Sequence, residues 1–401
     1  MKCDRETLID PDICLLFPKK EIDSPELTIL VPALNESLTI GEFVGWCIEG
    51  VNKAGVRGEI LIVDSSTDNT SEIALASGAR VLKTPKRGLG RAYIDALPFA
   101  RGKYLILGDC DLTYDFREIA PFVEAMRSGA DFVMGSRFSG YIEENAMPKL
   151  HRYFGTPLTT WILNRLYGTR FSDIHCGMRG ITKDAFEQMR MESQSWEYAS
   201  EMVIKAAKLR MKIEEVPIRF YKDREGRLSH HRRSGWLSPW RAGWINLKAM
   251  LLHAPDFFFL KPGLFLFVIG LILTFLGGTQ STIGALSFRL HWMLLGVCVT
   301  LVGFSSFQIG VIGKLWHGYH QNFELKSRRF FSYNKGMLCS TLSFILGLIL
   351  ITPSLYRYLR EGLTLPDVQY TGVFGLLLII LGFQIFGFAI LCELISTRKR
   401  R

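Results

Sequence analysis

Residues 103–115 read KYLILGDCDLTYD, an apolar run typical of a buried strand followed at once by three acidic residues. Asp109 and Asp111 are separated by one residue, so in an extended chain both side chains point to one side and Cys110 points to the other. Two carboxylates this close repel each other unless a cation lies between them. Hard oxygen ligands favour Mg²⁺ or Mn²⁺, and magnesium commonly binds one or two carboxylates together with substrate phosphates. The motif therefore indicates a metal-bound diphosphate.

Other apolar runs of strand length lie on both sides of this motif. They occur at residues 27–31, 59–63, 79–84 and 130–137. Helical stretches lie between them, for example GLGRAYIDAL at residues 88–97. Strands that alternate with helices predict βαβ units and a mostly parallel sheet, so the expected fold class is α/β.

Polar residues follow the ends of these strands, namely Asn35, Asp64, Asp109, Asp111 and Arg137. In an open parallel sheet, ligands bind outside the carboxyl ends of the strands, so these five residues indicate one shared site. Asp68 and Ser71 are better explained as helix caps. In KRGLGRA at residues 86–92, Gly88 and Gly90 would allow the backbone to approach a ligand closely.

The C-terminal part of the chain has a different composition. Four apolar runs follow one another at residues 262–278, 292–312, 337–351 and 373–392, with Tyr356 as the alternative end of the third. A spanning helix needs roughly 20 apolar residues, so we expect four transmembrane helices, with the first and third near the minimum length. Basic residues concentrate between the second and third runs and in the tail TRKRR, and Lys and Arg favour the cytoplasmic side. Both termini and the large N-terminal region are therefore expected in the cytoplasm.

Charge and cysteine usage narrow the class further. The net charge of +10 suggests nucleic acid at first sight, but the basic residues concentrate at residues 219–241 and in the membrane loops, which favours an anionic lipid surface. Residues 231–261 combine three Trp with basic residues, as an interfacial segment in the headgroup layer does. The eight cysteines have no zinc spacing and are most simply reduced thiols, and the N-terminus does not resemble a secretory signal.

Six stretches between residues 27 and 220 occur in a recognisable order: VPALNES, VDSSTDNT, GLGRA, GDCDLTYD, FVMGSRF and FSDIHCGMRGITKDAF. Together they resemble the family 2 inverting glycosyltransferases with a Rossmann-like GT-A fold, of the dolichyl-phosphate mannose or polyprenyl-phosphate glucose synthase kind. Two positions depart from the family pattern. Ser65 stands where a second Asp is usual, and Thr113 stands where many members have Gln. Thr113 is a poorer metal ligand, which leaves water or Asp115 as further ligands.

The resemblance implies roles for particular residues. The nucleotide sugar would be bound by Asp109 together with Pro32, Ala33, Asn35, Glu36, Asp64, Gly88 and Gly90. Catalysis would depend on Asp109, Asp111 and Arg137, with Mg²⁺ or Mn²⁺ held by the two carboxylates. The acceptor phosphate would be bound by Arg137, Arg152, Thr156 and Arg224, and Asp173 would orient the donor.

The expected activity is that of a membrane-bound hexosyltransferase. It would move a hexose from a nucleotide sugar, UDP-glucose or another UDP-hexose, to undecaprenyl or dolichyl phosphate at the cytoplasmic face of the inner membrane or, in a eukaryote, of the ER membrane. GDP-mannose is the alternative donor. A processive polysaccharide synthase fits less well because the chain has no Gln-x-x-Arg-Trp stretch, and a non-enzymatic scaffold fits less well because Asp109, Asp111 and Arg137 are all present.

The expected domains follow the changes in composition. Residues 1–26 form an N-terminal extension, 27–230 the catalytic domain and 231–261 the interfacial helices. Residues 262–395 form the four membrane helices and 396–401 a basic cytoplasmic tail. The simplest relatives have two membrane helices, and the extra pair leaves packing, homo-oligomer contact or lipid handling open as uses.

Overall fold

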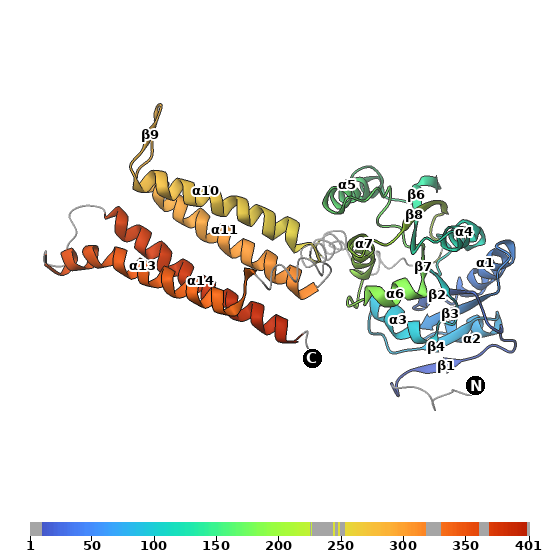
Figure 1. Ribbon diagram of the computed structural model, residues 1–401. Helices are drawn as coiled ribbons and strands as arrows, with labels where there is room; N and C mark the ends of the chain where they lie inside the picture. Colours follow the sequence, from blue (N-terminus) through green and yellow to red (C-terminus); the bar gives the residue numbers. More distant parts are fainter. Residues whose placement is uncertain are drawn as a thin grey trace. The chain divides into compact units, whose positions relative to one another are not determined.

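The computed structural model describes residues 10–224, 253–317, 330–360 and 369–398, together with the single positions 226, 244 and 248. The chain divides into two compact units, Met1–Met250 and Leu251–Arg401 (Figure 1). Most of the predicted interfacial segment, the basic connection between the second and third membrane helices, and most of the basic tail lie outside the described residues.

The first unit is built on an eight-stranded sheet with the order β1-β4-β3-β2-β5-β7-β6-β8. The strands are β1 (Cys14–Leu16), β2 (Leu27–Ala33), β3 (Gly58–Asp64), β4 (Arg80–Lys83), β5 (Tyr104–Leu107), β6 (Phe132–Ile142), β7 (Arg179–Thr182) and β8 (Ile213–Phe220). Strands β4, β3, β2 and β5 are parallel neighbours, and β6 is parallel to β8. The predicted α/β class with a mostly parallel sheet is therefore confirmed.

Three strands were not predicted. β7 lies antiparallel between β5 and β6, and β1 lies antiparallel on the edge strand β4. β1 and β7 have three and four residues, and β8 alternates buried and exposed residues instead of forming an apolar run. β1 and β7 are too short to show a period, and in β8 only Val216, Ile218 and Phe220 alternate with polar residues or proline, so none of the three forms the apolar run by which the other strands were predicted.

Seven helices accompany this sheet in the described residues: α1 (Ile40–Lys53), α2 (Thr70–Ala76), α3 (Leu89–Ala96), α4 (Ala120–Arg127), α5 (Thr156–Tyr167), α6 (Lys183–Met189) and α7 (Tyr198–Lys208). Short turns of other helical types occur at η1 (Leu97–Phe99), η2 (Phe116–Glu118) and η3 (His151–Gly155), the last a π-turn that leads into α5. Helix α1 contacts α2 and α4, whereas α7 contacts α3, α5 and α6. The two groups cover strands β2, β3 and β5, whose residues are almost all buried.

The second unit contains the four long apolar helices that the sequence predicts. They are α10 (Lys261–Gly278), preceded by the π-turn η4 (Asp256–Leu260), then α11 (Leu290–His317), α13 (Tyr333–Arg360) and α14 (Tyr370–Arg398). Each is long and apolar enough to cross a membrane. The third helix is longer than expected because it continues through Pro353. A small hairpin of β9 (Thr282–Ile283) and β10 (Leu286–Ser287) joins α10 to α11.

Helices α10 and α11 pack closely through glycines spaced seven residues apart. On α10 a Cβ at Gly263, Gly270 or Gly277 would lie 2.3–2.6 Å from backbone nitrogens of α11. On α11 the same holds for Gly296, Gly303 and Gly310 against α10 and the turn before it, at 2.3–2.5 Å. Small residues that let backbones touch are the usual basis of helix association in lipid, where the hydrophobic effect does not drive packing.

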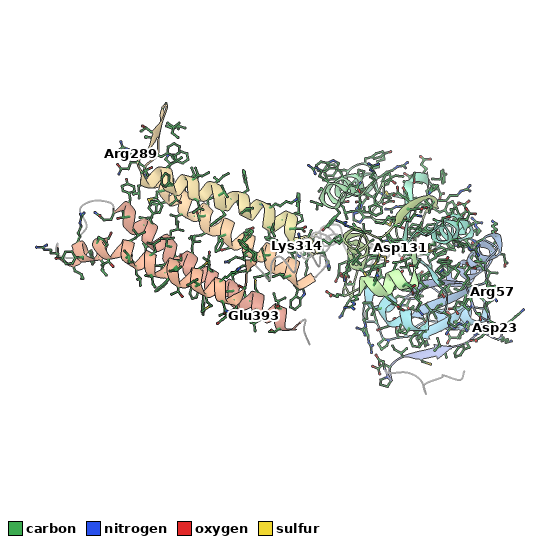
Figure 2. The ribbon with its side chains drawn as sticks, viewed as in Figure 1. Asp23, Arg57, Asp131, Arg289, Lys314 and Glu393 are labelled. Carbon is green, nitrogen blue, oxygen red and sulfur yellow. The ribbon has the colours of Figure 1, made fainter. Side chains whose placement is uncertain are left out.

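Two glutamines connect the helix pairs inside the apolar region. Gln308 Nε2 of α11 donates to the backbone carbonyl oxygen of Gln384 in α14 at 3.1 Å. The side-chain Nε2 of Gln384 donates to Ser305 Oγ of α11 at 3.0 Å. Charged residues lie instead near the helix ends, where Figure 2 labels Arg289 at one end of this unit and Lys314 and Glu393 at the other. This distribution fits a bilayer environment, because unpaired charge is costly at the bilayer centre.

The expectation of reduced thiols is correct for six of the described cysteines and wrong for one. Cys14 in β1 is disulfide-bonded. Cys47, Cys110 and Cys176 of the first unit are buried and form no disulfide.

Candidate active site

Asp109 and Asp111 follow β5 as the sequence predicts. Both are partly exposed, whereas Cys110 and Leu112 are buried, so the side chains alternate in the expected way. Asp111 Oδ1 also closes a local turn by accepting hydrogen bonds from the Thr113 backbone nitrogen at 3.0 Å and from Thr113 Oγ1 at 2.6 Å. Two accessible carboxylates with hard oxygen donors fit Mg²⁺ or Mn²⁺ when substrate phosphates and water complete the coordination shell.

The described residues hold no group of three or more His, Cys, Asp or Glu side chains that could bind a metal. Asp115, considered above as an extra ligand, serves another purpose. Its two carboxylate oxygens accept hydrogen bonds from Arg117 Nε and Nη2 at 2.7 and 2.8 Å, and Tyr221 Oη donates to Oδ2 at 3.0 Å. Burial alone would raise the pKa of Asp115, but the hydrogen bonds from Arg117 lower it below its ordinary value. Asp115 thus fixes the chain after the motif, and its use as a further metal ligand stays a prediction.

The loops after β2 and β3 hold each other in place. Asn35 has a φ of 57°, and its Oδ1 accepts a hydrogen bond from the Thr67 backbone nitrogen at 3.0 Å. The Glu36 backbone nitrogen donates to Thr70 Oγ1 at 3.0 Å. Asp64 is 1% exposed, and its carboxylate accepts hydrogen bonds from the Ser66 nitrogen and from the Ser71 hydroxyl. Pro32 and Ala33 end the strand beside this pair of loops, so the structure brings together five of the eight residues predicted to bind the nucleotide sugar.

Gly88 and Gly90 have a use that the sequence did not predict. A Cβ at Gly88, whose φ is 117°, would lie 2.3 Å from the Gln194 carbonyl oxygen. A Cβ at Gly90 would lie 2.3 Å from the Ser193 carbonyl oxygen. The close approach at these glycines is to the chain's own backbone, and their contact with a ligand stays a prediction.

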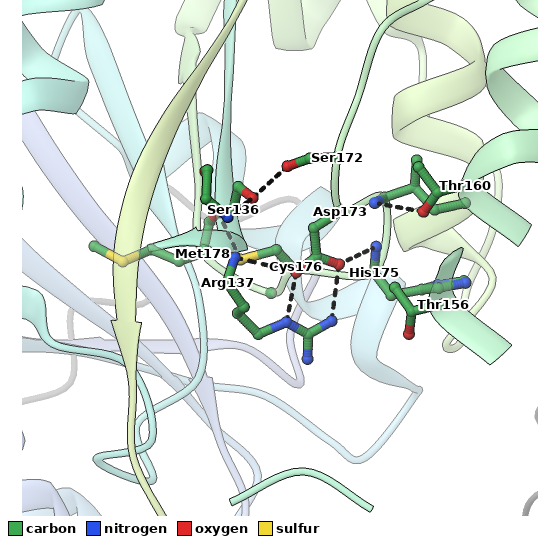
Figure 3. A network of polar contacts seen from close by, with 12 residues as sticks. Ser136, Arg137, Thr156, Thr160, Ser172, Asp173, His175, Cys176 and Met178 are labelled. Atoms are coloured by element: carbon green, nitrogen blue, oxygen red, sulfur yellow. Dashed lines mark hydrogen bonds and ion pairs between the residues drawn. The ribbon is translucent and has the colours of Figure 1, made fainter. Parts of the chain in front are cut away.

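Arg137 forms a buried forked ion pair with Asp173. Its Nε and Nη2 donate to Asp173 Oδ2 and Oδ1 at 2.6 and 2.9 Å, and its backbone nitrogen donates to Oδ2 at 3.2 Å. Arg137 is 8% exposed and Asp173 is fully buried. In Figure 3 the third guanidinium nitrogen points away from Asp173. Asp173 thus holds Arg137 in place, and its expected role in orienting the donor stays a prediction.

The loop that carries Asp173 is fastened by Arg179, which no part of the sequence analysis selected. Arg179 is fully buried, and its guanidinium donates to the carbonyl oxygens of Ile174, Cys176 and Ala199 at 3.3, 3.0 and 2.7 Å. These contacts fix both sides of the loop and join it to the start of α7. A buried cation needs such partners because its desolvation is costly.

The same loop touches the predicted metal site. The Gly177 backbone nitrogen donates to Tyr114 Oη at 2.9 Å. A Cβ at Gly177 would lie 2.8 Å from Asp109 Oδ2 and 3.1 Å from Tyr114 Oη, so only glycine fits without a shift. The structure therefore brings the metal motif next to the loop that holds the Arg137–Asp173 pair.

His175 and Cys176 are uncharged parts of this loop. Burial lowers the pKa of His175 to about 4 and raises the pKa of Cys176 to about 12. At neutral pH the imidazole and the thiol are both neutral, so Cys176 is not a thiolate nucleophile. His175 Nε2 hydrogen-bonds Thr159 Oγ1 of α5 at 2.8 Å, which joins α5 to the loop.

The other predicted acceptor residues lie in two places. Thr156 is 3% exposed at the start of α5, and its carbonyl oxygen accepts a hydrogen bond from Thr159 Oγ1, which also hydrogen-bonds His175. Arg152 lies one turn earlier with its guanidinium 5.7 Å from the Tyr153 ring. Arg224 lies after β8 and forms an ion pair with Glu42 of α1. Thr156 is thus linked through Thr159 to the loop of Asp173, Arg152 lies one turn before Thr156, and Arg224 has its partner on α1.

Comparisons with known proteins agree with this architecture. Residues 28–190 match the model of glycosyl transferase family 2, and residues 318–396 match the model of the glycosyltransferase family 2 C-terminal transmembrane region. The chain is 33% identical over 382 residues to "Low-salt glycan biosynthesis hexosyltransferase Agl6" of Haloferax volcanii, which covers 94% of this chain and 90% of that protein. The chain belongs to glycosyltransferase family 2. The predicted family, the GT-A domain and the membrane helices of this transferase are thereby confirmed.

Two further proteins are similar to part of the transferase. It is 29% identical over 201 residues to "Dolichyl-phosphate hexose transferase" of Haloferax volcanii, over 50% of this chain and 85% of that protein. Among solved structures, the mannosyltransferase PcManGT of Pyrobaculum calidifontis, in complex with GDP-Man and Mn²⁺, is similar with a TM-score of 0.38 and 17% identity, over 72% of this chain and 90% of that chain.

The transferase thus has three groups of residues along one edge of its sheet. The loops after β2 and β3 lie beside each other, the two carboxylates follow β5, and the Arg137–Asp173 pair lies next to them. Such a site can hold a cation on a diphosphate and bring a positive charge close to a second anion. Tyr114, Gly177 and Arg179 support this arrangement, and no local pattern in the sequence could have indicated their long-range contacts.

Proposed function

We propose that this membrane glycosyltransferase moves a hexose, with inversion, from a nucleotide sugar to a polyprenyl phosphate at the cytoplasmic face. The observation that carries the proposal is the contact between the Asp109 motif and the loop that holds the buried Arg137–Asp173 pair. The four apolar helices and the names of two relatives, a hexosyltransferase and a dolichyl-phosphate hexose transferase, support a lipid-phosphate acceptor and a hexose.

On the donor side, Asp109 and Asp111 are the residues that would hold Mg²⁺ or Mn²⁺. The bound cation would neutralise the diphosphate leaving group as its negative charge grows. The loops that contain Asn35 and Asp64 would hold the nucleotide. The preferred donor is a UDP-hexose, and GDP-mannose is the alternative donor. Gly177 leaves room beside Asp109, so the loop of Asp173 can approach the donor without a side chain in the way.

On the acceptor side, Arg137 would bind the phosphate through its third guanidinium nitrogen, with Arg152 and Thr156 nearby. The second pKa of a phosphate monoester is about 6, so the acceptor is already anionic at neutral pH and attacks without a general base. This fits Asp173, since both of its oxygens are engaged by Arg137 and neither would accept a proton from the nucleophile.

The experiment uses the full-length protein in nanodiscs with a panel of UDP-hexoses and GDP-mannose, each with undecaprenyl or dolichyl phosphate. Formation of a sugar–lipid is followed by mass spectrometry. We expect one UDP-hexose to be used, and Asp109→Asn and Asp111→Asn to abolish transfer. Asp23→Asn, at an exposed carboxylate of the same unit, is the control and should remain active. Lack of transfer from every donor, or full activity of the Asp109 and Asp111 variants, would contradict the proposal.

The proposed orientation has its own test. Reporters fused after Gln321 and after Arg401 should both report the cytoplasm, because the basic connection and the basic tail favour that side. Two helices, α13 and α14, lie between the two reporters. Reporters on opposite sides of the membrane would therefore contradict the proposal that both helices span it.

A further inference from the structure

The segment from Leu150 to Trp161 carries a continuous row of exposed apolar side chains on the catalytic unit. The exposed fractions are 68% for Leu150, 72% for Tyr153, 61% for Phe154, 40% for Leu158 and 64% for Trp161. Leu150 directly precedes the π-turn η3, and the other four lie on η3 and on α5, at spacings of three, four, eight and eleven residues from Leu150. Such spacings put side chains on one side of a helix. We call these five residues the α5 apolar face.

The opposite side of the same helix is bound to the catalytic unit. Thr160 is 4% exposed and accepts a hydrogen bond from the Ile174 backbone nitrogen at 3.4 Å. Leu163 is fully buried, and Asn164 Nδ2 donates to the Phe171 carbonyl oxygen at 2.7 Å. The helix is therefore held in one rotation, and that rotation turns the α5 apolar face outward.

The chain segment that carries the α5 apolar face has only positive charges. From residue 145 to residue 172 the chain contains no Asp or Glu, whereas it contains Lys149, Arg152, Arg165 and Arg170. Lys149, Arg165 and Arg170 are exposed. An apolar row of aromatic and aliphatic residues with a cationic rim is the pattern of helices that lie in the headgroup layer of an anionic membrane.

Other large apolar residues on the surface of this unit do not form a row. Ile48 of α1, for example, is 43% exposed, but its neighbour Glu49 forms an ion pair with Lys53 of the same helix. Single exposed apolar residues are normal on a soluble surface, whereas contiguous patches mark an interaction site. The α5 apolar face is thus distinguished by contiguity as well as by exposure.

We propose that the α5 apolar face docks the catalytic unit onto the anionic leaflet that also contains the membrane helices. A lipid surface is favoured over a protein partner because the same chain carries four helices able to cross a membrane, and because the whole segment is cationic. Docking would bring the acceptor residues of this helix, Arg152 and Thr156, to headgroup depth. That consequence rests on the proposed function, whereas the docking itself does not.

The test places a photo-crosslinking amino acid, p-benzoylphenylalanine, at Phe154 or Leu158 of the full-length protein in nanodiscs that contain phosphatidylglycerol. The matched control is the same substitution at Ile48, since Ile48 and Leu158 are 43% and 40% exposed. We expect lipid adducts, identified by mass spectrometry, at Phe154 and Leu158 in several-fold excess over Ile48. Equal yields at the three positions would overturn the proposal, as would adducts to protein, whether from the same chain or from a second copy.

The role of charge is tested in the same experiment. With Lys149, Arg165 and Arg170 each changed to Gln, lipid adducts at Leu158 should fall several-fold in nanodiscs with phosphatidylglycerol, towards the yield seen with phosphatidylcholine alone. A yield that depends on neither lipid charge nor these substitutions would overturn the assignment to an anionic surface. Because the readout is a lipid adduct, it is independent of transfer activity, and a failure of docking can be distinguished from a failure of the proposed reaction.

Discussion

The substitution Asp173→Asn tests the central contact of the candidate site. Asp173 is fully buried and accepts three hydrogen bonds from Arg137. In Asp173→Asn the buried guanidinium faces a neutral amide, whose NH2 group donates hydrogen bonds and so cannot accept one from Arg137. Removal of one partner from a buried ion pair costs about 3–5 kcal/mol. Since each 1.4 kcal/mol is a factor of ten, the loop around Asp173 should open roughly two to four powers of ten more often.

The chain offers a matched control for this magnitude. Arg127 forms the same forked pair with Glu26, at 2.9 and 2.7 Å, but its side chain is 42% exposed and that of Glu26 is 35% exposed. Exposed pairs contribute about 0.2–1 kcal/mol to stability. Glu26→Gln should therefore change the frequency with which the Asp173 loop opens by a factor of about five at most. The two variants differ in burial and share the geometry.

Cys176 provides the assay, because its thiol is fully buried three residues after Asp173 and reacts only when the loop opens. The rate at which a thiol reagent labels Cys176 in the full-length protein is measured by mass spectrometry of its peptide. Asp173→Asn should accelerate this labelling strongly and Glu26→Gln hardly at all. Equal rates for the two variants would refute the reasoning, since they would mean that burial adds nothing to the Arg137–Asp173 pair.

Three further predictions concern charge, metal and membrane packing. Burial lowers the pKa of His175 to about 4 from an ordinary 6.5, so on acidification the unfolded chain binds the proton before the folded chain does. The free energy of unfolding should therefore fall by up to about 3 kcal/mol as the pH falls from 6.5 to 4. In denaturant titrations His175→Gln should show a smaller loss over this pH range. Chelation of divalent metal should abolish transfer and leave the thermal unfolding of the chain nearly unchanged, and added Mg²⁺ or Mn²⁺ should restore activity; full activity in excess chelator would argue against the metal. Gly270→Leu should separate α10 from α11, because a Cβ there already lies 2.3 Å from the Thr300 nitrogen, and it should lower the yield of folded protein in detergent, whereas Gly284→Leu in the hairpin loop, with open space but a φ of 59°, should cost only local backbone strain.

Much of the architecture could be predicted from the sequence because its signals are local. Strands β2, β3 and β5 are continuous apolar runs, and a fully buried parallel strand needs nothing else to be recognised. The four membrane helices follow from the length and hydropathy of single segments. Asp109 and Asp111 could be selected for the same reason, since the end of a strand and the spacing of two residues are both visible in a short stretch.

The parts that the sequence did not determine depend on contacts between distant residues. Arg137 was predicted to follow the end of its strand, but it lies within β6, which continues to Ile142. Its partner Asp173 lies 36 residues away and could be identified only once β6 and the loop before β7 were brought together. Gly88 and Gly90 were interpreted from their flexibility, and only the packed chain showed that this flexibility serves the backbone of residues 193 and 194. The seven-residue glycine repeat of α10 can be read in the sequence. Its role in helix packing became clear only when the structure set it against the matching glycine repeat of the antiparallel helix α11. In each case the sequence determined which groups are available, and tertiary structure decided their partners, because hydrogen bonds and van der Waals contacts act over a few ångströms of space regardless of separation along the chain.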